Sequence, residues 1–195
     1  MMGGHFTNTA AFVVDTVLSL YAVLALVRFW LHFCGADIYH PVSQFVVRMT
    51  EPAVALLGKL VPNPRGVDVP AIALLFATEL LRVWLLAMLS DWPLAGPAQP
   101  VILALALSLR AFFYLLIILV IARAVMSWFA PGRNPLYHLI VTATEPVMRW
   151  PRKILPPFGG LDLSPILLLL ALGVLLRLLV NPLMQMAGGL AGLVG

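Results

Sequence analysis

The sequence predicts an all-α membrane protein, in which four transmembrane helices form two parallel two-helix repeats. Of its 195 residues, 62% are hydrophobic and only 10% are charged, and the mean hydropathy is +1.02. A soluble domain of this length could not cover its surface with so few polar groups. The third observation is a set of apolar stretches that each approach the roughly 20 residues needed to span a bilayer.

These apolar stretches are the expected transmembrane helices, and they cover residues 10–33, 69–90, 100–129 and 164–186. No basic residue precedes the first stretch. A cleaved signal would begin with a basic region, so we expect a retained helix.

Lysine and arginine orient the expected helices. Those outside the apolar stretches all lie in the two long connections, as Arg48, Lys59, Arg65, Arg133, Arg149, Arg152 and Lys153. The amino tail, the connection 91–99 and the carboxyl tail contain neither residue type. By the positive-inside rule, both long connections face the cytoplasm and both termini lie on the non-cytoplasmic side.

An internal repeat divides the chain into halves. The segment RMTEPAVALLGKLVPNPRGVD, Arg48 to Asp68, matches TATEPVMRWPRKILPPFGGLD, Thr142 to Asp162, at seven of 21 positions without a gap. The predicted repeats cover residues 9–90 and 100–187, and residues 188–195 form a flexible tail. Each half crosses the membrane twice, so the two copies must point the same way, unlike the inverted repeats common in transporters.

Each long connection carries an amphipathic segment, which we call a platform. After Pro41 and after Pro135, apolar residues recur at the spacing of one helical face. Pro52 and Pro146 disfavour helical geometry at the glutamate before them. Each platform is therefore predicted to be a kinked pair of short helices on the cytoplasmic surface.

The charged residues of the platforms are candidates for binding lipid or a protein partner: Glu51, Lys59, Asp68, Glu145, Arg149, Arg152, Lys153 and Asp162. Lys59 and Lys153 are placed to reach lipid headgroups. For the two aspartates a capping or turn role is favoured over recognition. Glu51 and Glu145 have no sufficient local role, so they are the first candidates for contact with a partner.

Ionisable residues also occur inside the apolar stretches. By helical rise, one layer on the far side of the midplane should contain Asp15, Glu79, Arg82, Arg110 and Arg177. Unpaired, each would cost at least ~2.5 kcal/mol there, so we expect pairing. Asp15 should bridge to Arg110, its equivalent in the other repeat. Glu79 can bind Arg82 at i+3 and also Arg177 from the other repeat. A structural clamp between the halves is favoured over a polar path for an ion.

No pattern indicates catalysis or a cofactor. The four histidines lack a metal-ligand spacing, and no phosphate-binding loop or activated nucleophile is visible. The single cysteine, Cys34, excludes an intrachain disulfide. The net charge of +4 suits platforms that face an anionic leaflet, so no nucleic acid partner is expected.

Residues 127–165, SWFAPGRNPLYHLIVTATEPVMRWPRKILPPFGGLDLSP, carry a family resemblance. Together with the looser first copy, in which HFCGADIYHP replaces SWFAPGRNP and VPNPRGVDVP replaces LPPFGGLDLSP, this pattern resembles the YggT family. The resemblance implies a bacterial inner-membrane protein, multi-pass, with plastid relatives. Such proteins have been connected with osmotic or envelope stress, ion uptake, cell division and cytochrome assembly.

Two functions follow as expectations. The leading one is a non-enzymatic inner-membrane scaffold or assembly factor, which binds membrane lipids and a membrane protein partner through its platforms. The alternative is a small-cation channel or uptake component. Homo-oligomerisation is left open.

Overall fold

The computed structural model describes residues 2–62, 67–90, 96–129, 134–155 and 162–188. The elements in chain order are α1 (Met2–Phe33), α2 (Pro41–Leu57), α3 (Val69–Leu89), α4 (Ala98–Phe129), α5 (Pro135–Ile154), α6 (Ser164–Leu175), the π-helical η1 (Leu176–Val180) and α7 (Asn181–Met186). No strand occurs in these ranges. Apart from Gly188, the predicted tail lies outside them, as do Arg65 and Arg133.

Four helices are long and apolar enough to cross a membrane, and they confirm the predicted fold class. These spans are Thr9–Phe33, Val69–Leu89, Ala98–Ser127 and Ser164–Met186, the last built from α6, η1 and α7 in one continuous rod. Their limits differ from the predicted ones by at most two residues, because length and hydropathy mark such helices strongly.

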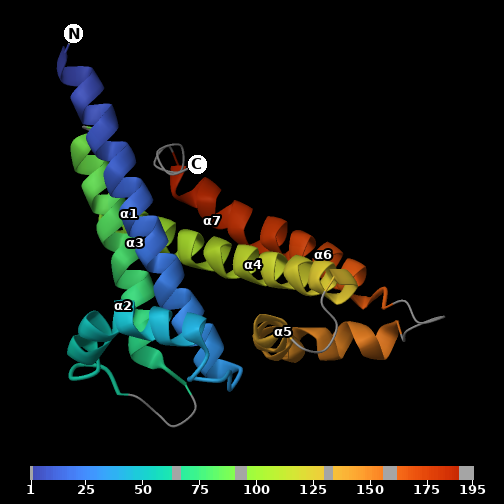
Figure 1. Cartoon of the computed structure of the whole chain (residues 1–195). Coiled ribbons are helices and arrows are strands. Elements are labelled where there is room, and N and C mark those ends of the chain that lie inside the picture. The colour runs from blue at the N-terminus through green and yellow to red at the C-terminus, as the bar shows by residue number, and fades with distance from the viewer. Residues whose placement is uncertain (1, 63–66, 91–95, 130–133, 156–161, 189–195) are drawn as a thin grey trace.

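The two halves repeat one arrangement, helix, platform, helix (Figure 1). In the first half α1 packs against α3, and in the second α4 packs against the α6–η1–α7 rod. The spans in α3 and α4 are more enclosed than the other two. Of an apolar stretch of 18 residues in each span, 44% and 39% are buried in α3 and α4, against 17% in each outer span. The outer helices therefore present apolar faces to lipid.

The platforms α2 and α5 lie at the same end of the molecule, as the parallel repeat requires (Figure 1). Each is one helix, with Pro52 inside α2 and Pro146 inside α5, so the predicted pair of short helices is wrong. A proline removes one helical hydrogen bond and bends a helix, but it need not end it where packing holds both segments. That packing comes from Thr50 and Thr144, which are fully buried just before each proline. Figure 1 shows α5 changing direction along its length.

The predicted orientation of the two ends is testable by labelling. Ser90 at the end of α3 and Arg149 on α5 are both exposed and lie at opposite ends of the spans. In a Cys34→Ala background, we expect a membrane-impermeant maleimide to label Ser90→Cys from outside the membrane that holds the protein. Arg149→Cys should be labelled only after that membrane is made permeable. Labelling of both cysteines from the same side would contradict the orientation.

Candidate functional site

The first arginine clamp ties three helices together around Arg28, near the end of α1. Its Nη1 lies 2.8 Å from Oε2 of Glu51 and 3.2 Å from Oγ1 of Thr50, both on α2. Its Nε lies 2.9 Å from Oδ2 of Asp68, which precedes α3. The Arg28 side chain is only 13% exposed and that of Asp68 9%, so this part of the clamp is shielded from solvent. One guanidinium thus fixes α2 across the ends of α1 and α3.

Thr50 and Asp68 each have a second, local bond that orients them. Asp68 accepts a hydrogen bond from the backbone N–H of Ala71 at 3.2 Å, which confirms its predicted capping role. The hydroxyl of Thr50 donates to the carbonyl of Val46 at 2.7 Å, which leaves its oxygen to accept from Arg28. The clamp is therefore preorganised by the two helices that it joins.

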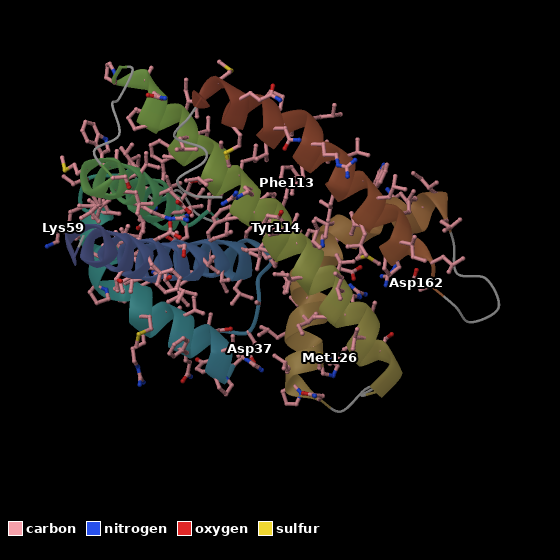
Figure 2. All side chains as sticks on the ribbon, turned by 90° about the horizontal axis from the view of Figure 1, so that it is seen from above. Asp37, Lys59, Phe113, Tyr114, Met126 and Asp162 are labelled. Carbon is pink, nitrogen blue, oxygen red and sulfur yellow. The ribbon has the colours of Figure 1, made fainter. Side chains whose placement is uncertain are left out.

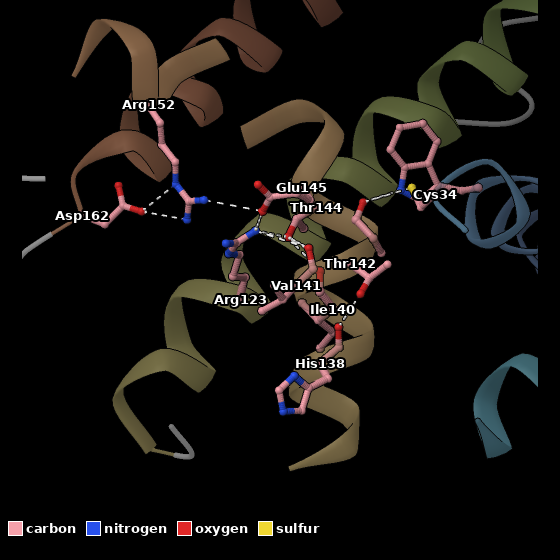
Figure 3. A network of polar contacts seen from close by, with 12 residues as sticks. Cys34, Arg123, His138, Ile140, Val141, Thr142, Thr144, Glu145, Arg152 and Asp162 are labelled. Atoms are coloured by element: carbon pink, nitrogen blue, oxygen red, sulfur yellow. Dashed lines mark hydrogen bonds and ion pairs between the residues drawn. The ribbon is translucent and has the colours of Figure 1, made fainter. Parts of the chain in front are cut away.

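The second clamp repeats these contacts around Arg123 of α4 (Figure 3). Nη1 of Arg123 donates to Oγ1 of Thr144 at 2.7 Å and lies 3.4 Å from Oε2 of Glu145. Thr144 donates to the carbonyl of Ile140 at 2.7 Å, as Thr50 does to Val46. The repeated Thr-Glu-Pro motif hence serves the same purpose in both halves.

The two clamps differ in which residue binds the aspartate, Asp68 in the first half and Asp162 in the second. Arg152 stands where the first half has Gly58, and its guanidinium lies 3.5 Å from Oε2 of Glu145 and 3.2 Å from Oδ2 of Asp162 (Figure 3). Partial burial raises the pKa of Asp162, but hydrogen bonds from Ser164 and Arg152 outweigh it and hold that pKa below its usual value. In the second clamp, an additional cation, Arg152, therefore connects Glu145 to Asp162.

The hypothesis that Glu51 and Glu145 lack a local role is wrong, because both bind the clamp arginines. The recurrence of Arg28 and Arg123 in the repeat was visible in the sequence, but their direction toward the platforms was not. Lys59, Arg149 and Lys153 are exposed at the platforms, where contact with headgroups or a partner stays a prediction.

Contacts beneath the platforms join the two halves. The indole N–H of Trp30, at the end of α1, donates to the carbonyl of Ala143 on α5 at 2.8 Å, and this bond is buried. The thiol of Cys34 approaches the same carbonyl at 3.6 Å. Trp30 also meets Phe112 of α4 edge-on, with ring centroids 5.3 Å apart. The end of α1 in the first half therefore contacts both α4 and α5 of the second half.

Within the membrane layer, Arg82 of α3 is the central cation. Its Nη2 lies 2.6 Å from Oδ1 of Asp15, and its Nη1 lies 3.1 Å from Oε2 of Glu79. The second pair is the predicted i, i+3 contact. Asp15, which repeat symmetry paired with Arg110, binds Arg82, because α3 is the main neighbour of α1.

Arg110 faces the same cluster across a cavity of about 360 Å³, whose lining also includes Glu79, Arg82, Ser19 and Tyr114. Four of the five predicted layer residues are thus brought together. Arg177 is not among them, since it lies exposed on η1. In the described ranges, no three His, Cys, Asp or Glu side chains are placed to hold a metal ion.

Removing Arg28 should destabilise the fold more than removing Arg123, its equivalent in the second clamp. Arg28→Leu leaves the buried Asp68 unpaired, so we expect a cost of about 3–5 kcal/mol, seen as a lower Tm in mild detergent. Arg123→Leu should cost less, because Arg152 still binds both Glu145 and Asp162.

The matched controls for this comparison are Glu51→Gln and Arg149→Leu. Glu51 is 54% exposed, so its replacement should cost under about 1 kcal/mol, and Arg149 is exposed. Equal Tm values for Arg28→Leu and Arg149→Leu would show that the clamp does not hold the helices.

The thiol of Cys34 should react slowly. Burial raises its pKa from 9.0 to about 11, which lowers its thiolate fraction at pH 8 about 100-fold. We expect maleimide to modify it slowly relative to an exposed Arg149→Cys in a Cys34→Ala chain, at a rate that still rises between pH 9 and pH 10. A rate that levels off near pH 9 would mean that the thiol is solvated.

Comparisons with known proteins agree with the geometry of the halves. The model of the CCB3/YggT family matches residues 7–89 and 102–183, one segment in each half. The uncharacterized protein YggT of Escherichia coli K12 is 31% identical over 169 residues, covering 86% of this chain and 87% of the relative. The uncharacterized protein PA0392 of Pseudomonas aeruginosa is 39% identical over 188 residues, covering 93% of each chain.

A plastid relative matches a shorter part. The chloroplastic protein CCB3 of Arabidopsis thaliana, which is named for cofactor assembly of complex C, is 35% identical over 89 residues, covering 45% of this chain and 49% of the relative. No solved structure matches the chain. With two matched segments and bacterial relatives aligned over most of its length, the chain belongs to the CCB3/YggT family of multi-pass membrane proteins.

Proposed function

We propose that the protein is a non-enzymatic scaffold or assembly factor of the bacterial inner membrane, which binds lipid and a membrane protein partner through α2 and α5. The observation that carries this proposal is the division of each platform into two faces. The polar face is held inward by an arginine clamp, and large apolar side chains point outward.

The outward faces have the composition of interfacial helices. Phe45, Met49 and Leu56 are exposed on α2, and Trp150 and Ile154 are exposed on α5. Basic residues flank both sets, as Arg48, Lys59, Arg149 and Lys153. An apolar face between basic side chains favours the boundary of an anionic leaflet, where the apolar groups enter the acyl region and the cations meet phosphate.

A rigid, duplicated surface also favours a protein partner. Because the clamps fix both helices to the spans, the exposed aromatic groups Phe45 and Trp150 are presented without a large ordering cost. The name of the Arabidopsis relative supports assembly of a membrane complex as the setting. Osmotic or envelope stress and cell division are further settings in which such a scaffold would act.

The alternative, a path for small cations, has weaker support. The cavity beside Glu79 and Arg110 lies within the spans, but both Asp15 and Glu79 are bound to Arg82. A cation path needs carboxylates whose charge is not already neutralised. The layer therefore favours a clamp that holds α1 against α3.

The proposal is tested by changing only the outward faces. We expect Phe45→Gln with Trp150→Gln to lower the recovery of specific partners about tenfold, because exposed aromatic anchors carry much of an interface's energy. The measurement is purification from native membranes in mild detergent, with quantitative mass spectrometry. Tyr39→Gln with Leu60→Gln is the matched control, since both residues are 78% exposed and lie just outside α2.

Two results would contradict the scaffold. Partners that are retained equally by the platform variant and the control would mean that α2 and α5 are not the binding surface. Potassium flux through reconstituted wild-type protein, abolished by Glu79→Gln and unchanged by the platform variant, would favour the cation path instead.

A further inference from the structure

Arg177 is a charged side chain on an apolar outer face of the molecule. It follows Ser164 by 13 residues, about 20 Å into the fourth span at helical rise. Leu170, Val174 and Leu178 are exposed on the same stretch. Within the part of the chain that the structure describes, Arg177 makes no hydrogen bond or ion pair. A guanidinium facing hydrocarbon is costly, so it requires a polar group from outside this chain.

The backbone around Arg177 is itself unusual. Leu176–Val180 form a π-helical turn between α6 and α7, and Arg177 is its second residue. Such a turn holds one residue more than an α-helical turn, which changes the face that later side chains occupy, and it is frequent at functional sites. The irregular turn and the exposed charge thus coincide at one depth of the membrane.

The complementary charge lies on α1. Asp15 precedes Arg28 by 13 residues, so it lies about 20 Å along α1 from the arginine of the first clamp. A third of its side chain is exposed, at 33%, and both of its contacts with Arg82 go through Oδ1, at 2.7 Å to Nε and 2.6 Å to Nη2. A carboxylate accepts several hydrogen bonds, so Oδ2 can serve a second guanidinium. Phe12, one helical turn before Asp15 on the same face of α1, adds exposed apolar surface beside it.

One copy of the chain cannot form this pair by itself. Seen from above, α1 and the α6–η1–α7 rod lie on opposite sides of α4 (Figure 2). Two copies inserted the same way up can form it, because both groups lie about 20 Å along their helices from the platform side and the exposed side chains near them are apolar. We infer that Arg177 of one copy binds Asp15 of a second copy, so that the protein self-associates laterally in the membrane.

The contact joins two different faces, so it is heterologous. Repetition of such a contact closes into a ring where the rotation allows it, or continues as a row. It lies within the spans and uses no residue of the platforms, so it is independent of the scaffold proposal. A second copy is always present in the correct orientation, which distinguishes it from an arbitrary membrane helix.

Cross-linking between tagged copies tests this inference. Two full-length chains, both with Cys34→Ala, are co-expressed with different tags, one carrying Leu18→Cys and the other Val174→Cys. Leu18 is half-buried and Val174 is exposed. Each lies three residues from its charged neighbour, Asp15 or Arg177, on the same helical face and on the platform side. We expect a bifunctional maleimide to link the two tags in native membranes. Arg177→Leu in the second chain should lower the yield about tenfold, and Arg177→Lys should retain most of it.

In the matched control, the second chain carries its cysteine as Leu81→Cys instead. Leu81 is exposed on α3, next to Arg82, and this pair of chains should not be cross-linked. Expression and Tm of the Arg177 variants are measured alongside, and Arg177→Gln serves where the leucine variant is poorly recovered. A yield equal to that of the Leu81→Cys control would overturn the inference. So would a yield that neither Arg177→Leu nor Arg177→Gln changes, since Arg177 would then be satisfied by lipid phosphate or another protein.

Discussion

The structure depends on providing hydrogen-bond acceptors for one arginine side chain at the platform end of each half. Arg28 and Arg123 project from long apolar helices, and a guanidinium there has five donors to satisfy away from bulk water. The Thr-Glu pair supplies a hydroxyl and a carboxylate on one turn of a helix. To deliver both, that helix must lie across the end of the span. The position of each platform therefore follows from the arginine, and the buried threonine keeps the helix continuous through the proline.

Duplication has left the two clamps unequal. In the first, Arg28 contacts Glu51 and Asp68 directly, at 2.8 and 2.9 Å. In the second, Arg123 lies 3.4 Å from Glu145, and Asp162 is bound by Arg152 instead. Charge-assisted hydrogen bonds weaken as they lengthen, so the arginine binds the glutamate less tightly in the second clamp. It binds the threonine hydroxyl more closely there, at 2.7 Å against 3.2 Å. The added cation, Arg152, compensates for the weaker glutamate contact by binding both Glu145 and Asp162.

The sequence predicted the spans and the repeat well, because both depend on patterns that extend over many residues. Which side chains bind one another inside the fold depends on how the helices pack. Such sequence patterns carry no information about that packing. Repeat symmetry indicated Arg110 as the partner of Asp15, whereas contact between α1 and α3 selects Arg82. Local backbone preference indicated a break at Pro52 and Pro146, whereas burial of Thr50 and Thr144 overrides it. Glu51 and Glu145 were predicted to need an external partner only because the direction of the arginines was unknown.

Recognition must then rest on groups that the fold does not use. The clamp carboxylates are bound internally, so a scaffold of the kind proposed would use the exposed aromatic and basic side chains of α2 and α5. Two such surfaces on one face of one molecule make the second contact intramolecular once the first has formed, which raises avidity without new interactions. Lateral association through Arg177 would multiply these surfaces further, still facing the same way. A parallel repeat provides this geometry, whereas an inverted repeat would place its two platforms on opposite sides of the membrane.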